Sequence, residues 1–496
     1  MSPKGTSSKD ELFPSFVDDR AMQNEGRRAH SVLSGAARLF SAQAIRRLVR
    51  WPFLLVVARV LGPELFGVYA FLIALVEMLA VVSGQSFSDY LARESAKFPD
   101  SARKLAVRLT QLRCFYIVLL LAITFPILFV SGYSPSILGS AACLSIILFP
   151  RAIFESSQGL MRGANHLVPF PWLELLQGAV LLGIGIPVLV LGGGLRGLIW
   201  TEIASALSGT VAAVPLSLPL FPRIAAFQLS WKKLVQATLA FNVFPLIVNL
   251  YDRLDVVLLS KLAGNLAVGI YATPYRVLST LQCLPGGLMT ALLPSLSRSL
   301  WDDKESQRCD DVMTVLYVAA LLFILVTMLL ADPVVLLALG KSYAGSALVL
   351  KILIWATIPM FLNFGLNMFL LARSREKLFL RTASVCFVVN VVANLVLIPR
   401  FSYFAAAGVT IATELVLLVQ NVFIVRSSLG FLPMPGKFLR VSIGFVLLLG
   451  AGVTAMQHLP IFANAALFVV VFVLYLYVSG STSSFASLAK DALSAG

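Results

Sequence analysis

Charged residues are scarce in this sequence. Only 13% of its 496 residues are Asp, Glu, Lys or Arg, whereas soluble domains contain about 25%. Hydrophobic residues make up 58% of the chain, and the mean hydropathy is +0.89. The apolar residues fall in repeated runs of near-spanning length, about fourteen in all, which is typical of transmembrane helices. These features exclude a soluble globular protein and predict an all-α polytopic membrane protein.

Several motifs that would indicate other classes are also missing. The five cysteines are scattered without metal-ligand spacing, so we expect neither a disulfide framework nor a metal site. No phosphate-binding loop of the Gly-x4-Gly-Lys-Ser/Thr type is present, which argues against ATP as the energy source. Residues 1–30 are polar and charged and have no apolar central region, so we expect no cleavable signal peptide.

The basic residues that are present lie mostly in short loops. With the N-terminus placed inside, 27 of the 39 Lys and Arg residues fall in cytoplasmic loops or tails and five fall outside. This asymmetry predicts that both termini are cytoplasmic, and it explains the net charge of +15 without a nucleic-acid partner. Residues 86–111 mix apolar and basic side chains, so we expect them to lie along the inner leaflet, attracted by anionic membrane lipid.

The first apolar span carries three arginines, Arg46, Arg47 and Arg50. A charge at bilayer depth is costly and normally faces a bundle interior or a water-filled cavity. Arg46 and Arg50 share one helix face, and arginine binds phosphate with a bidentate fork. The cluster therefore indicates an anionic, phosphate-bearing substrate. Alternatively, Arg46 and Arg47 extend to lipid headgroups from the end of the helix, whereas the deeper Arg50 is expected in the cavity.

A short motif occurs in both halves of the sequence. Residues 62–70 read GPELFGVYA and residues 264–272 read GNLAVGIYA, so both have the form G-x4-G-x-Y-A at an offset of 202. An Ile-Pro pair also precedes a Thr-Glu pair by the same spacing in both halves, ending at Glu202 and at Glu414. Two motifs in the same order predict two equivalent bundles. Because each has six spans, an even number, the repeat is parallel.

The predicted organisation has six parts. We expect a cytoplasmic tail (1–33), an N-terminal six-helix bundle (34–220), a cytoplasmic linker (221–234), a C-terminal six-helix bundle (235–427), transmembrane helices 13 and 14 (438–480) and a cytoplasmic C-terminal tail (481–496). The two bundles would surround a central cavity, with the last two helices outside the repeat.

Three stretches resemble the polysaccharide-biosynthesis and oligosaccharide-flippase family. They are RVLGPELFGVYAF after the first span, YDRLDVVLLSKLAGNLAVGIYATPYRVLSTL with the later LLPSLSR, and NVVANLVLIPRFSYFAAAGVTIATE. The resemblance covers most of residues 35–430. It implies a cavity that opens alternately to each side, and transport of an undecaprenyl-pyrophosphate-linked glycan across a bacterial cytoplasmic membrane. The related lipid II flippases carry cavity arginines in their first span, for which Arg46, Arg47 and Arg50 are the candidates here.

Other polar residues within spans extend the candidate site. The candidate substrate-binding residues are Arg46, Arg47, Arg50, Arg276, Asn363 and Asn367, and the candidate gating or coupling residues are Glu77, Asp252, Arg253 and Asp255. Asp252 and Asp255 are one helical turn apart, so one of them can pair with Arg253 or Arg276, either as a structural ion pair or as a gate or ion-coupling site. Asn363 and Asn367 either hydrogen-bond between helices or contact sugar hydroxyls. Glu77 either forms an ion pair with the span-one arginines or takes up a coupling proton.

Three functions compete at this point. The first is a flippase for a lipid-linked oligosaccharide, such as an O-antigen or exopolysaccharide repeat unit. The second is a multidrug or cation antiporter, which would need carboxylates where span one has arginines. The third is a membrane glycan polymerase or ligase, which would need larger outer loops with catalytic residues. We expect a non-enzymatic flippase without catalytic residues, cofactor or metal, driven by a proton or sodium gradient or by the membrane potential. The polysaccharide polymerase and export machinery are further candidate partners.

Overall fold

The chain is helical throughout the part that the structure describes. In this computed structural model, the described residues are 19–222, 230–287, 305–372, 376–429, 436–455, 460–485 and 487–488. Within these ranges, ten helices are long and apolar enough to cross a membrane. The prediction of an all-α, multi-pass membrane protein is therefore confirmed.

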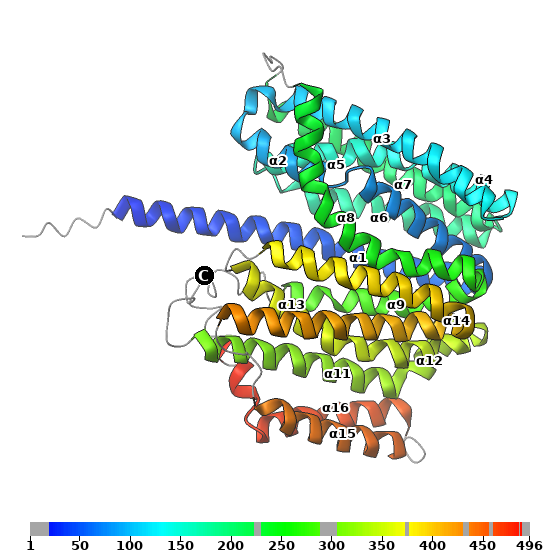
Figure 1. The fold of residues 1–496 in the computed structure, drawn as a ribbon, viewed down its shortest axis with the longest axis vertical. Coiled ribbons are helices and arrows are strands. Elements are labelled where there is room, and N and C mark those ends of the chain that lie inside the picture. Colours follow the sequence, from blue (N-terminus) through cyan, green and yellow to red (C-terminus); the bar gives the residue numbers. More distant parts are fainter. Residues whose placement is uncertain are drawn as a thin grey trace, which may run out of the picture.

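The N-terminal lobe occupies the upper part of Figure 1. Its helices are α1 (Asp19–Val82), α2 (Phe87–Lys97), α3 (Ala102–Val130), α4 (Pro135–Ser145), α5 (Leu148–Gly163), α6 (Pro169–Val190) and α7 (Gly194–Ser217), with short 3-10 turns η1 (Pro99–Ser101) and η2 (Leu218–Leu220). Its outer helices are exposed over large apolar areas, as expected of helices that face lipid.

The C-terminal lobe lies below it. Its helices are α8 (Trp231–Leu262), α9 (Asn265–Leu281), α11 (Glu305–Leu339), α12 (Ala344–Leu353), α13 (Thr357–Ala372) and α14 (Glu376–Leu429), with turns η3 (Lys341–Tyr343) and η4 (Ile354–Ala356). The first turns of α8 lie beside the N-terminal lobe, near α2, and the helix then continues into the C-terminal lobe (Figure 1). The last two helices, α15 (Lys437–Ala455) and α16 (Ile461–Val478), pack against α11 through a separate apolar cluster. They form an appendix to the lobe, as the sequence predicts.

Two of the long helices each reverse direction. Arg50 and Glu77 line one cavity, although a continuous helix would separate them by about 40 Å. The reversal lies at Gly62, whose φ of 73° interrupts the helical geometry. Ser402 (φ 52°) interrupts α14 in the same way. Counting each of these helices as two crossings, and adding α8 and α9, gives the fourteen spans expected from the sequence.

The repeat motif forms the contact between the lobes. A Cβ atom on Gly67 would lie 1.8 Å from the backbone oxygen of Asn265, and one on Gly269 would lie 1.8 Å from that of Pro63. The offset of 202 relates Gly67 to Gly269 and Pro63 to Asn265, so these two contacts are equivalent under the repeat. Only glycine permits such close backbone contact. The two halves therefore meet around a pseudo-twofold relationship, as expected of a parallel repeat.

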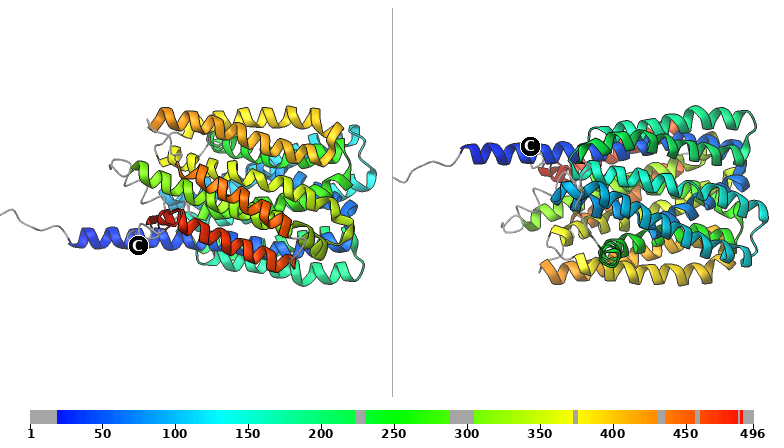
Figure 2. Two further views of the ribbon diagram at one scale, coloured as in Figure 1. Left: turned by 90° about the horizontal axis from the view of Figure 1, so that it is seen from below. Right: turned by 90° about the horizontal axis from the view of Figure 1, so that it is seen from above.

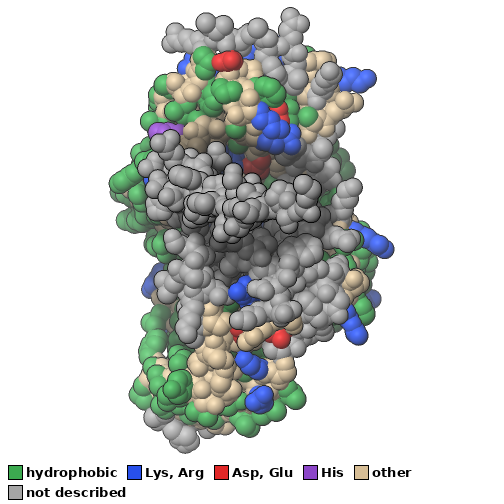
Figure 3. Space-filling view, turned by 90° about the vertical axis from the view of Figure 1, so that its left-hand side faces the viewer, with side chains coloured by type: hydrophobic (Ala, Val, Ile, Leu, Met, Phe, Trp, Pro, Cys, Tyr) green, Lys and Arg blue, Asp and Glu red, His purple; other side chains and the backbone are tan. Residues whose placement is uncertain are grey.

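Both ends of the described chain emerge on the same side of the molecule. In Figure 2, the first turns of α1 extend beyond the bundle on the side where the described part of the chain also ends. Basic and acidic side chains come to the surface on this face, above and below its middle (Figure 3). We call this side the termini-bearing end and the opposite side the distal end.

Residues 86–111, which the sequence predicts to lie along the inner leaflet, do not form a single surface segment. Residues 102–111 belong to the long helix α3, so only α2 and η1 are short enough to lie along the surface. The apolar side chains Phe87, Tyr90 and Leu91 of α2 are buried in a cluster with α3, α5 and α8. Protein packing, and not lipid, therefore covers most of the apolar face of α2.

Candidate substrate cavity

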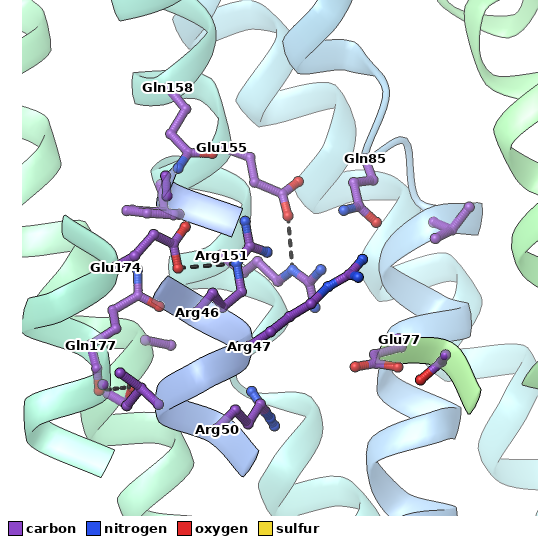
Figure 4. Close-up of a pocket in the computed structure, with 18 of the residues that line it drawn as sticks. Arg46, Arg47, Arg50, Glu77, Gln85, Arg151, Glu155, Gln158, Glu174 and Gln177 are labelled. Carbon is purple, nitrogen blue, oxygen red and sulfur yellow. Dashed lines mark hydrogen bonds and ion pairs between the residues drawn. The ribbon is translucent and has the colours of Figure 1, made fainter. Parts of the chain in front are cut away.

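A polar cavity of about 760 Å³ lies between the two lobes (Figure 4). Its lining comes from both halves of α1 and from α2, α5, α6, α7, α8 and α9, and it reaches Leu39 and Asp89 near the termini-bearing end. The charged lining residues are seven arginines (Arg46, Arg47, Arg50, Arg151, Arg162, Arg253 and Arg276) and six acids (Glu77, Asp89, Glu155, Glu174, Glu202 and Asp252). The structure thus brings most of the predicted site residues together.

Two of the span-one arginines are paired with buried glutamates. Arg46 Nε lies 3.1 Å from Glu174 Oε2, and Arg50 Nη2 donates to Glu202 Oε1 at 2.9 Å. The Tyr69 hydroxyl donates to the same Glu202 oxygen. Both glutamate side chains are only 5% exposed, so each needs its guanidinium to compensate a buried charge. In this conformation Arg46 and Arg50 each have a carboxylate partner within the protein.

Arg47 is the span-one arginine that remains available. Its Nη1 is buried without a hydrogen-bond partner, and Figure 4 shows the side chain extending across the cavity toward Gln85 and Glu77. Arg276 on α9 lines the cavity from the other lobe, and its guanidinium has no ion-pair partner among the described residues. Two cations from opposite lobes therefore face the same space without an ion-pair partner among the described residues, an arrangement suited to binding an anion.

Arg253 and Glu77 form an ion pair between the lobes. Arg253 Nη2 on α8 lies 3.0 Å from Glu77 Oε2 on α1. Neither Asp252 nor Asp255 is within ion-pair distance of Arg253 or Arg276 among the described residues, so the predicted pairing is not found. Asp255 instead accepts hydrogen bonds from the Tyr271 hydroxyl at 2.6 Å and from the Val256 amide at 2.7 Å. Neighbouring side chains on one helix point in different directions, and Arg253 faces the cavity whereas Asp255 faces the core.

A further charged cluster supports the wall of the N-terminal lobe. Glu155 accepts from Arg151 Nε at 2.8 Å, as its i, i+4 spacing predicts, and from the buried Arg113 at 2.6 Å. Arg162 and Asp89 pair at 2.6 Å between α5 and α2. The pairing of Arg113 with Glu155 was not predicted from the sequence. The sequence feature that could have indicated it is the position of Arg113 next to an apolar span, because a charge near bilayer depth normally has a charged partner.

Asn363 and Asn367 lie on α13, away from the cavity lining. The Asn363 amide is buried and donates to the side chain and backbone carbonyl of Glu414 at 3.0 Å each. It also accepts from Asn421 at 3.1 Å. These contacts connect α13 to the second half of α14, as expected of amides that hydrogen-bond between helices.

Solved structures with the same fold are membrane transporters and flippases. The chain is similar to "Lipid II flippase MurJ, inward closed conformation", with a TM-score of 0.66 and 14% identity over 89% of this chain and 98% of that one. It is also similar to an inward-facing multidrug resistance transporter of the MATE family (TM-score 0.62, 14% identity, 80% and 98% coverage). A third similar structure is the Vibrio cholerae MATE transporter VcmN in the bent form (TM-score 0.52, 15% identity, 80% and 98% coverage).

At these identities, the solved structures establish the fold and not the substrate. No curated protein matches the sequence. A family model described as "Polysaccharide biosynthesis protein" matches residues 56–348, which is more than half of the chain and includes the interlobe motif and Arg253 and Arg276. On this match, the chain belongs to the family of polysaccharide biosynthesis proteins.

Proposed function

We propose that this protein is a flippase for an undecaprenyl-pyrophosphate-linked oligosaccharide. It would move the polysaccharide repeat unit from the cytoplasmic to the outer leaflet of the bacterial cytoplasmic membrane by alternating access, with both termini in the cytoplasm. The observation that carries this proposal is that Arg47 and Arg276 lie on opposite walls of one interlobe cavity and have no ion-pair partner among the described residues. The family match and the fold shared with a lipid II flippase support it.

A pyrophosphate group needs such a pair because its charge is costly to move through a region of low dielectric constant. Arginine stays protonated and forms two parallel hydrogen bonds to phosphate oxygens. Two guanidinium groups on different lobes would bind the anion in the closed arrangement and separate when the lobes move apart. This geometry allows binding to be reversible, which a carrier requires.

The alternative functions are less well supported by the cavity. A multidrug or cation antiporter of the same fold would need carboxylates free to bind a cation or proton. Five of the six lining carboxylates have an arginine partner, and Asp252 is the exception among the described residues. A polymerase or ligase would need catalytic groups at the distal end, where the connections between described helices are short.

We infer no cofactor for this function. The energy source would be a proton gradient, a sodium gradient or the membrane potential. Transport in proteoliposomes under each imposed gradient separates these three.

The test of the proposal is glycan export in cells that carry charge variants at matched protein levels. Arg47→Glu and Arg276→Glu should each abolish export and cause the lipid-linked glycan to accumulate on the cytoplasmic face. Arg196→Ala is the matched control, because Arg196 is exposed and outside the cavity. Normal export by both Glu variants would refute the anion site and favour the antiporter.

A further inference from the structure

Two cationic side chains connect the lobes at the distal end. Arg59 Nη1, at the end of the first half of α1, donates to the backbone oxygen of Leu337 in the last turn of α11 at 2.9 Å. Lys261 Nζ, at the end of α8, donates to the backbone oxygen of Ser131, just after α3. Each cation belongs to one lobe, and its acceptor belongs to the other.

These two contacts are equivalent under the internal repeat. Arg59 and Lys261 are related by the same offset of 202 that relates the two glycine motifs. Their acceptors end α11 and α3, which are the third spans of the two bundles. The first span of each bundle thus binds the end of the third span of the other bundle.

Two tyrosines repeat the same reciprocal pattern. The Tyr343 hydroxyl, just after α11, donates to the backbone oxygen of Ala58 at 2.9 Å. The Tyr133 hydroxyl, just after α3, donates to Ser260 Oγ at 3.5 Å. Ala58 and Ser260 also differ by 202 residues. In both pairs of contacts, the end of the first span of one bundle therefore contacts the end of the third span of the other.

The chemistry of the acceptors makes these contacts reversible. The last carbonyls of a helix have no partner within the helix and carry the negative end of its dipole, so a cation there is favourable. The contacts of Arg59 and Lys261 are exposed, and water can replace them when they break. Gly67 and Gly269, by contrast, are buried, and Tyr69, Tyr271 and Tyr343 are fully buried in the same apolar cluster.

We propose that Arg59 and Lys261 form a paired latch that keeps the cavity closed at the distal end. Both contacts must break when the lobes separate there, and both re-form when they close. The inference rests on the alternating access of the proposed function and is independent of the identity of the substrate.

The test measures the distance between the lobes in purified protein in lipid nanodiscs. Spin labels are placed at Leu191, at the end of α6, and at Phe401, in the reversal of α14, which are 85% and 58% exposed. Cys114, Cys143 and Cys283 are replaced by alanine, because only Cys309 and Cys386 are buried. Electron–electron double resonance then reports the closed and open populations at the distal end without any substrate.

The double variant Arg59→Ala/Lys261→Ala should raise the ratio of distally open to closed protein by about tenfold or more, since each lost contact is a charge-assisted hydrogen bond. The effects of the two single variants should add in free energy, because the two contacts have different partners and break in the same opening. Arg59→Lys and Lys261→Arg keep a cation at each position and should keep the closed population.

Arg196→Ala removes an exposed distal cation without an interlobe contact and should have no effect. A double variant that is monodisperse and retains the wild-type distance distribution would overturn the latch. Because the readout uses no substrate, this result would leave the anion site of the proposed function standing. Conversely, a failed export test would leave the latch unaffected.

Discussion

Arg253 and Glu77 form an ion pair between the two lobes inside the cavity, with Arg253 Nη2 3.0 Å from Glu77 Oε2. The two side chains are about 30% exposed, so cavity water screens the pair and its net stabilisation is modest. Arg253 lines the same cavity as the unpaired Arg276. On the proposed function, an anion bound there would compete with Glu77 for Arg253. Substrate binding and the release of an interlobe contact would then be connected by direct competition.

The substitution Glu77→Gln should strengthen anion binding and slow transport. It removes the carboxylate that competes for Arg253, so the affinity for inorganic pyrophosphate should rise by about three- to tenfold. Release should slow by a similar factor because Glu77 no longer displaces the anion. Calorimetric titration of purified protein measures the affinity, and Glu77→Asp is the control that retains the charge. An unchanged affinity in the Gln variant would show that Glu77 and the anion do not compete.

Removing Arg50 should lower the stability of the protein, whereas removing Arg47 should lower transport. Arg50→Ala leaves the Glu202 carboxylate, which is 5% exposed, without a cation and should destabilise the protein by about 2–3 kcal/mol. Arg47→Ala removes a group without a partner and should lower transport at unchanged stability. Thermal unfolding monitored by fluorescence separates the two outcomes.

The double variant Arg50→Ala/Glu202→Gln provides the control for this assignment. It removes the charge that Arg50→Ala leaves unpaired, so it should recover most of the lost stability. If the double variant were as unstable as Arg50→Ala alone, the ion pair would not be the cause of the loss.

Alanine at either interlobe glycine should prevent normal closure of the distal end. A Cβ on Gly67 or Gly269 would lie 1.8 Å from a backbone oxygen, which cannot move without displacing its helix. We expect a loss of about 1–3 kcal/mol or more for Gly67→Ala. Gly183→Ala is the matched control. Gly183 lies on α6 of the same lobe, and a Cβ atom there would have no neighbouring heavy atom within 4 Å. Equal melting temperatures for the two variants would contradict the close contact.

Side-specific labelling should place the termini-bearing end in the cytoplasm. A cysteine at Leu191 should react with an impermeant thiol reagent from outside the cell, whereas a cysteine at Lys97 should react only after permeabilisation. Both positions are exposed and lie at opposite ends of the bundle. The reverse labelling pattern would invert the proposed direction of transport.

The sequence by itself determined the class of fold. Long apolar spans leave few alternatives, because a backbone in lipid must satisfy its hydrogen bonds within helices or closed barrels. The motif at residues 62–70 and 264–272 determined the repeat, since its glycines are required wherever two backbones touch or φ is positive. The sequence also indicated that Arg46, Arg47 and Arg50 belong to one charged surface.

Only the tertiary structure decided which of these arginines is free. Arg46 and Arg50 are neutralised by Glu174 and Glu202, which lie more than a hundred residues away in the chain. Arg47, between them in sequence, extends into the cavity and has no carboxylate partner in the part of the chain that the structure describes. Ion pairing depends on distances of a few ångströms between different helices, and helix periodicity constrains only neighbours on the same helix. For this reason the residue types of the site were readable from the sequence, whereas their pairing became visible only when the two lobes were placed together.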